Sequence, residues 1–191
     1  IPGKYQSQEE QQTCIECQVG QASDLEARNQ TCDNCTKGRY QPKKGTTSCL
    51  PCVPGKYNNG RGALSCMRCT EGKYSDEVAR NKTCDNCHKG THQPDEGMTA
   101  CLDCIPGTYQ SELGQIDCKL CKLGKASSMP ARNRSCDNCL KGTHQSENGT
   151  TACLDCIPGK YQSELEQNDC KICGKGKYSE EVARTNDCTL C

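Results

Sequence analysis

All twenty-two cysteines of this 191-residue chain lie in Cys-x-x-Cys doublets, from Cys14/Cys17 to Cys188/Cys191. The doublets follow one another at intervals of 17 or 18 residues, and the steps 18, 17 and 17 repeat along the chain. Self-similarity at a fixed period is typical of repeat architectures, in which each short unit touches mainly its neighbours. The sequence therefore predicts a tandem array of small modules, of which three make one 52-residue super-repeat.

The super-repeat divides the chain into five predicted segments. They are a partial module at 1–13, super-repeats at 14–65, 66–117 and 118–169, and a partial super-repeat at 170–191. The chain begins in mid-repeat, because Ile1-Pro2-Gly3-Lys4-Tyr5 matches residues 157–161, which directly follow a doublet. We therefore expect the chain to be a segment of a longer protein.

The composition excludes an ordinary hydrophobic core. Phe and Trp are absent, and seven Tyr are the only aromatic residues. Modules shorter than about 40 residues usually need disulfides, metal ions or partners to fold. Cysteine at this density indicates a disulfide scaffold, which forms in oxidising extracellular or cell-surface settings. The predicted fold class is small and disulfide-rich: an extended tandem array of short β-hairpin-like cysteine-rich modules, with little regular secondary structure and no large core.

Charge and motifs narrow the possible functions. The 24 basic and 24 acidic residues are interspersed and give zero net charge, which argues against nucleic acid as a partner. No apolar run approaches the ~20 residues that a membrane span needs, so we expect no membrane insertion in this segment. No Ser/His/Asp set or Gly-rich phosphate loop recurs, so we expect no catalytic residues, no cofactor and no enzyme activity.

A glycine, here called the doublet glycine, lies three residues after each doublet that is followed by further chain. In most modules a ring follows two residues later: Gly38/Tyr40, Gly55/Tyr57, Gly72/Tyr74, Gly90/His92, Gly107/Tyr109, Gly142/His144, Gly159/Tyr161 and Gly176/Tyr178. We expect the glycine to permit a backbone turn and the ring to cover a disulfide, supplying most of the module's apolar burial. His92 and His144 take the Tyr position and are expected to pack, and His88 is expected to face solvent.

Two local patterns predict backbone structure between the doublets. The stretch Ser75–Asn81, repeated in every third module, fits a single helical turn that Ser or Asp could cap. Asn59-Gly60, Glu96-Gly97 and Asn148-Gly149 are expected to form turns in which Gly takes a positive φ.

The Cys-x-x-Gly-x-Tyr element, the following 14- or 15-residue loop and the next Cys-x-x-Cys together resemble known modules. They are similar to the smallest module of tumour-necrosis-factor-receptor cysteine-rich domains and to the ephrin-receptor-like cysteine-rich repeats of surface proteins. The resemblance covers the whole chain, although those receptors interleave several module types whereas this chain repeats one spacing throughout. It implies that the second cysteine of each doublet bonds the first cysteine of the next.

Carried onto this chain, the resemblance implies ten disulfides. They are Cys17–Cys32, Cys35–Cys49, Cys52–Cys66, Cys69–Cys84, Cys87–Cys101, Cys104–Cys118, Cys121–Cys136, Cys139–Cys153, Cys156–Cys170 and Cys173–Cys188. In the chain-entropy model, a disulfide that closes a loop of about 15 residues stabilises the folded state by about 3 kcal/mol. Cys14 and Cys191 are left for bonds to adjoining segments of a longer chain or to other copies of this one. Spacing alone also allows first-to-first and second-to-second pairing.

Two other uses of the doublets are less consistent with the pattern. Two doublets at this separation also suit a four-cysteine zinc site. Eleven doublets is an odd number, however, and none is distinguished as a partner, so we expect no metal site. A thioredoxin-like redox role lacks the βαβ pattern that such motifs accompany.

Acceptor triplets for N-glycosylation, Asn-x-Ser/Thr, occur at Asn29, Asn34, Asn81, Asn133 and Asn148. Asn29, Asn81 and Asn133 occupy the same place in successive super-repeats, and the fourth copy has Thr185 there. We predict covalent glycans at these three. Asn148 is a further candidate, as is Asn34, which is wedged between cysteines.

The sequence favours a structural component of an extracellular fibre, surface hair or coat, built from disulfide-stapled and glycosylated repeats. Its partners would be copies of itself or adjoining segments of a longer chain. The alternative is the ectodomain stalk of a cell-surface receptor or adhesin that binds a protein ligand. Recognition would require modules with distinctive exposed aromatic or Arg residues, whereas these super-repeats differ mainly in their turns.

Overall fold

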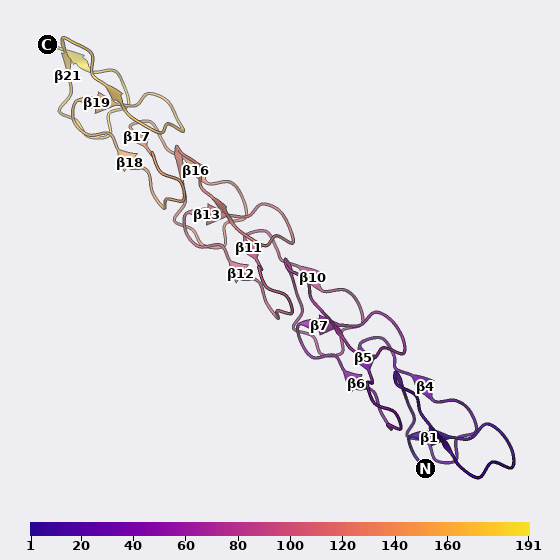
Figure 1. The fold of residues 1–191 in the computed structure, drawn as a ribbon. Helices are drawn as coiled ribbons and strands as arrows, with labels where there is room; N and C mark the ends of the chain where they lie inside the picture. The colour runs from indigo at the N-terminus through magenta and orange to yellow at the C-terminus, as the bar shows by residue number, and fades with distance from the viewer. The chain divides into compact units, whose positions relative to one another are not determined.

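The computed structural model describes all 191 residues and contains short β-strands without helices. Each of the 22 strands has two residues, and each pairs antiparallel with the next or preceding strand to give separate two-stranded hairpins. Figure 1 shows these hairpins following one another along the chain. The first strand of a hairpin follows a doublet glycine, and the second lies between the cysteines of the next doublet. The predicted class, a disulfide-rich tandem array of hairpin modules without a large core, is confirmed.

The chain forms two compact units. The first comprises residues 1–86 and 93–101, and the second residues 87–92 and 102–191. The hairpins of the first unit are β1 (Lys4–Tyr5) with β2 (Ile15–Glu16), β3 (Gln21–Ala22) with β4 (Asp33–Asn34), β5 (Arg39–Tyr40) with β6 (Leu50–Pro51), β7 (Lys56–Tyr57) with β8 (Met67–Arg68), and β9 (Lys73–Tyr74) with β10 (Asp85–Asn86).

The second unit holds the remaining hairpins. They are β11 (Thr91–His92) with β12 (Leu102–Asp103), β13 (Thr108–Tyr109) with β14 (Lys119–Leu120), β15 (Lys125–Ala126) with β16 (Asp137–Asn138), β17 (Thr143–His144) with β18 (Leu154–Asp155), β19 (Lys160–Tyr161) with β20 (Lys171–Ile172), and β21 (Lys177–Tyr178) with β22 (Thr189–Leu190).

The doublet glycine sets the turn that begins each hairpin. Gly55, for example, has a φ of 79°, in the left-handed region that side chains with a Cβ disfavour. The amide of the next residue, Lys56, donates to the Val53 carbonyl at 3.1 Å, and the Gly55 carbonyl accepts from the Cys69 amide at 2.8 Å. Each hairpin is therefore closed on one side by the turn and on the other by the next doublet.

Two of the local expectations are wrong. No helical turn forms in Ser75–Asn81, where Ala79 instead takes a left-handed φ of 57°. This residue is seven positions after its doublet glycine, and the residue at that place, here called the apex residue, has a positive φ in every module. In the Asn59-Gly60 loop the apex is therefore Gly62, with a φ of 67°, and Gly60 has no positive φ. The positive φ expected at Gly97 and Gly149 is observed.

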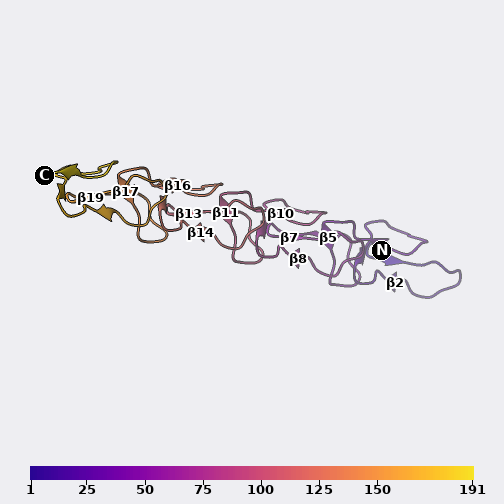
Figure 2. The ribbon, with the colours of Figure 1, turned by 90° about the horizontal axis from the view of Figure 1, so that it is seen from above.

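Successive modules within each unit are joined by backbone hydrogen bonds. The Gly55 amide donates to the Ser75 carbonyl in the next module at 2.7 Å, and the Ala79 amide of that module donates back to the Cys52 carbonyl at 2.7 Å. Equivalent bonds recur along both units, and Figure 2 gives a second view of the same hairpins and their connecting loops. Because the bonds use main-chain groups, the contact between modules tolerates different side chains.

The contacts also extend to the second module along, beyond the expected nearest-neighbour pattern. A Cβ added at Gly55 would overlap the backbone carbonyl of the apex residue Gly97, two modules away within the same unit. Gly107 lies in the same way against the carbonyl of Gly149. At these two positions the doublet glycine is thus required both for its positive φ and because the backbone of another module packs directly on it.

The interior of the array consists of cysteines and polar side chains. The fully buried side chains include Arg80, Gln93, Gln110, Gln162, Ser75 and nine cysteines. The expectation that the rings supply most of the apolar burial is wrong, since the tyrosines are half-buried and Tyr178 is exposed. With so few large apolar residues, disulfides and hydrogen bonds replace the usual core.

Candidate functional site: disulfides, buried polar side chains and exposed asparagines

The disulfides join the second cysteine of one doublet to the first of the next. The pairs are Cys17–Cys32, Cys35–Cys49, Cys52–Cys66, Cys69–Cys84, Cys104–Cys118, Cys121–Cys136, Cys139–Cys153, Cys156–Cys170 and Cys173–Cys188. Cys87 and Cys101 are disulfide-bonded as well. Cα separations of 5.5 to 5.8 Å are those of ordinary disulfides. This arrangement is the one implied by the sequence resemblance, and it leaves Cys14 and Cys191 as exposed free thiols.

The histidines at the ring position contact protein groups. His144 Nδ1 lies 3.3 Å from Cys170 Sγ and 3.1 Å from the Leu154 carbonyl oxygen. His144, Cys156 and Cys170 are close enough together to hold a metal ion, but the two cysteines are joined by a disulfide and so offer no thiolates. His92 Nδ1 lies 3.0 Å from the Ile116 carbonyl oxygen. His88 is exposed.

In most modules with a 14-residue disulfide loop, a buried Gln holds the loop together, whereas Asn58 stands at this place in the Cys52–Cys66 loop. Gln110, three residues after its doublet glycine, donates from Nε2 to the Asp117 carbonyl at 2.7 Å and accepts from the Glu112 amide at 3.1 Å. Its side chain amide thus spans the loop while its own hydrogen bonds are satisfied. The same pair of bonds is made by Gln41, Gln93, Gln145 and Gln162.

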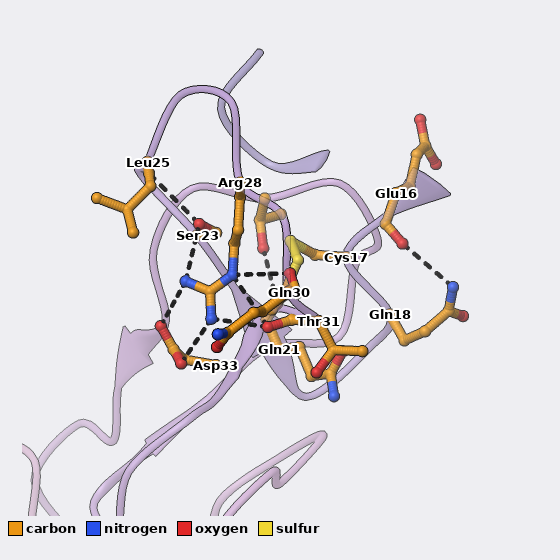
Figure 3. Close-up of a disulfide and its surroundings, with 12 residues drawn as sticks. Glu16, Cys17, Gln18, Gln21, Ser23, Leu25, Arg28, Gln30, Thr31 and Asp33 are labelled. Carbon is orange, nitrogen blue, oxygen red and sulfur yellow. Dashed lines mark hydrogen bonds and ion pairs between the residues drawn. A yellow bond between two sulfur atoms is a disulfide. The ribbon is translucent and has the colours of Figure 1, made fainter. Parts of the chain in front are cut away.

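In the modules with a 15-residue loop, an Arg and a Ser replace the Gln, and this Arg is buried at Arg80 and Arg132 and half-buried at Arg28 and Arg184. Figure 3 shows the Arg28 guanidinium between Ser23, Asp33 and the Thr31 carbonyl. Arg28 donates to Thr31 O at 2.7 Å and to both carboxylate oxygens of Asp33 at 2.8 and 2.9 Å. Asp33 belongs to the Cys-Asp-Asn-Cys doublet that ends the loop, so the ion pair ties the loop to β4, the second strand of the module's own hairpin. We call this arrangement the Arg clamp.

The Arg clamp recurs once per super-repeat. Arg80 and Arg132 pair with Asp85 and Asp137, at 2.7 and 2.6 Å, and their side chains are 1% and 3% exposed. In the fourth copy Thr189 stands in place of the Asp, and Arg184 donates to its hydroxyl at 3.1 Å. Sequence reasoning missed both the Gln and the Arg clamps. The sequence signal of the buried Gln is its place three residues after the doublet glycine. The signal of the Arg clamp is a Ser at that place, followed five residues later by an Arg.

Removing the Arg80 side chain is expected to loosen its module. Arg80→Ala deletes charge-assisted hydrogen bonds in a buried site, a loss of about 2–3 kcal/mol. The Asn58 amide, which donates to the Arg80 carbonyl, should then exchange its hydrogen about 30-fold faster or more. Arg184→Ala is the matched control, because that side chain is 17% exposed and its clamp lacks the Asp. Equal effects of the two variants on their own modules would contradict this role.

Acid is expected to weaken the clamps. The hydrogen bond from Arg28 holds the pKa of Asp33 below its ordinary value, and Arg132 does the same to the pKa of Asp137. A depressed carboxyl pKa contributes stability above the unfolded pKa of about 4, and this contribution is lost as pH falls through the folded pKa. Stability measured from pH 8 to pH 2 should stay level to about pH 5 and then decline. Asp137→Asn should reduce the decline, and an unchanged profile would contradict the assignment.

The asparagines of the predicted acceptor triplets are all exposed, but their surroundings differ. Asn29, Asn81 and Asn133 each directly follow the Arg of a clamp. Asn34 lies in β4, where its Oδ1 accepts a hydrogen bond from Gln21 at 3.2 Å. Asn148 precedes the apex residue of its module.

Comparison with known proteins agrees with this architecture. Residues 20–69 and 95–131 match the family model described as tyrosine-protein kinase ephrin type A/B receptor-like. A comparison with curated proteins found no match. The matched residues include complete disulfide loops, such as Cys35–Cys49 and Cys52–Cys66, with the hairpins that they close. The structure is therefore a tandem array of disulfide-bonded modules, and the matched residues are similar to ephrin-receptor-like cysteine-rich modules.

Proposed function

We propose that this chain is a structural segment of an extracellular fibre, surface hair or coat, in which copies or adjoining segments continue the array. The observation that carries the proposal is the repeated main-chain contact between modules. Each module offers the same amides and carbonyls to the next, whatever its side chains, so modules can be added without a new kind of interface. An array that extends by one repeated contact suits a load-bearing structure.

The chemistry of the modules supports an oxidising location. Twenty of the twenty-two cysteines are in disulfides, which persist outside the cytosol. No helix of the structure is long and apolar enough to cross a membrane. Ephrin-receptor-like cysteine-rich repeats typically serve as non-catalytic structural domains, which agrees with a mechanical role.

Negative-stain electron microscopy of unreduced native material tests the proposal. We expect long filaments with a regular repeat along their length. Isolated short particles that retain a bound protein ligand would overturn the fibre and favour a receptor or adhesin stalk. Reducing gel electrophoresis of the same material adds a second readout: bands far above 20.9 kDa indicate one long chain, and a band near that mass indicates disulfide-linked copies.

A further inference from the structure

We propose that Asn29, Asn81 and Asn133 are the principal N-glycosylation sites of the chain, with much lower occupancy at Asn34 and Asn148. The inference rests on passage through a secretory pathway, which the proposed function also requires, but it does not depend on fibre assembly. The five asparagines share the acceptor triplet, so the sequence by itself treats them alike. The structure separates them by what surrounds each asparagine and the hydroxyl residue of its triplet.

The first observation is that the Arg clamp holds the backbone of the three periodic triplets. Arg80 Nε and Nη2 donate to the Thr83 carbonyl at 3.0 and 2.7 Å, so the last residue of the Asn81-Lys82-Thr83 triplet is fixed through its main chain. Arg132 makes the corresponding bonds to the Ser135 carbonyl at 3.0 and 2.7 Å. The side chains of the triplet are thereby left outside the clamp.

The second observation is that both reacting side chains of the periodic triplets are accessible. Asn81 and Thr83 are exposed, and the same holds for Asn29 with Thr31 and for Asn133 with Ser135. The three asparagine side chains make no hydrogen bond within the protein. An exposed, unpaired carboxamide beside an exposed hydroxyl remains available after the module has closed, and a glycan on it displaces no contact.

The third observation is that packing does not require Asn at this place. In the fourth copy the residue after the clamp Arg is Thr185, and Arg184 still donates to the Asn186 and Asp187 carbonyls at 3.2 and 3.1 Å. The clamp therefore forms without the asparagine. Asn at three successive positions, 52 residues apart, is then explained by a reaction of its side chain and not by the fold.

The other two triplets are engaged by the fold. The Oδ1 of Asn34 accepts a hydrogen bond from Gln21 on the paired strand β3 at 3.2 Å, so this carboxamide is already held by the fold. In the Asn148-Gly149-Thr150 triplet, the Thr150 hydroxyl is buried without a hydrogen-bond partner. The Gly149 amide donates to the Cys121 carbonyl at 2.8 Å. Once this module closes, its hydroxyl is withdrawn from the reaction.

The reaction that uses these sites is transfer of an oligosaccharide from a lipid-linked pyrophosphate donor. The asparagine Nδ2 forms a bond to C1 of the first sugar, the bond from C1 to the pyrophosphate oxygen breaks, and Nδ2 loses one proton. The donor and the transferase belong to the secretory pathway and supply everything else that the step needs. The three glycans would recur once per super-repeat and cover backbone edges of the short hairpins.

Quantitative glycopeptide mass spectrometry of native, unreduced protein tests the site assignment. Enzymatic release of glycans in heavy-oxygen water converts each occupied Asn to a labelled Asp, so occupancy can be counted at each position. We expect most molecules to be labelled at Asn29, Asn81 and Asn133, and few at Asn34 and Asn148. Three bare periodic asparagines, or occupancy at Asn148 equal to theirs, would overturn the proposal even if filaments are seen.

Variants secreted from a eukaryotic host separate glycosylation from folding. Thr83→Ala removes the exposed hydroxyl but keeps the carbonyl that Arg80 binds, so the protein should fold and lose one glycan. Thr83→Ser should retain that glycan. Thr150→Ala, the matched control in the Asn148 triplet, should leave the glycan mass nearly unchanged. Loss of a full glycan with Thr150→Ala and no loss with Thr83→Ala would contradict the assignment.

Discussion

Replacing Gly55 with Ala is expected to destabilise the array much more than replacing Gly159 with Ala. Both glycines have nearly the same φ, 79° and 81°, so the left-handed backbone costs each variant about the same, on the order of 1–2 kcal/mol. At Gly55 the new methyl group would also overlap the Gly97 carbonyl, whereas no atom lies within 4 Å of the corresponding position at Gly159. Overpacking of this kind costs typically about 1–3 kcal/mol more. The pair thus separates backbone strain from the packing of one module on another.

Hydrogen exchange of individual amides measures this difference. In Gly55→Ala the Ser75 amide, which donates to the Met98 carbonyl, should lose protection together with the Ala79 amide. In Gly159→Ala the loss should stay close to the substituted turn. Equal local losses in the two variants would show that the second-neighbour contact contributes nothing to stability.

Deleting one internal disulfide is expected to open several modules at once. The paired change Cys104→Ala and Cys118→Ala removes the closure of a 14-residue loop, which costs about 3 kcal/mol in the chain-entropy model. The Cys104 carbonyl also accepts a hydrogen bond from the Ala131 amide in the next module. Opening the Cys104 loop should therefore also weaken this bond between the two modules. Exchange of the Ala131 amide should therefore accelerate about 100-fold.

The matched control removes the disulfide of the last complete loop. Cys173→Ala with Cys188→Ala also opens one loop, of 15 residues, but the Ala131 amide lies far along the chain from it. Its exchange should remain unchanged in this variant. Acceleration of Ala131 to the same degree in both variants would mean that the unit unfolds as a whole and not module by module.

The module and its disulfide loops could be predicted because their signals are local. Doublet spacing and the glycine three residues later lie within one hairpin, and the resemblance supplied the pairing that spacing alone left open. The helical turn was wrong because Ala79 has a high helix propensity but occupies the apex, where the Cys52 carbonyl and the second-neighbour glycine set its backbone.

The polar interior could not be predicted from hydrophobicity. The expectation that Tyr rings fill the modules follows the usual rule for apolar burial. In this chain the space inside a loop is lined with backbone carbonyls, and only donors such as Gln110 or Arg80 satisfy them while filling it. The contact between Gly55 and Gly97 could not be predicted either, because it depends on how three consecutive modules stack, and no short sequence motif is specific to that stacking.

The pairing of each doublet with the next is the central claim, and nonreducing peptide mapping tests it most directly. Cleavage before Asp103 and after Lys119 separates Cys104 and Cys118 from the other cysteines of their doublets. The structure predicts that residues 103–119 are recovered as one product, held by the Cys104–Cys118 disulfide and joined to no other segment. Recovery of Cys118 joined to Cys101, or of Cys104 joined to Cys121, would contradict the account.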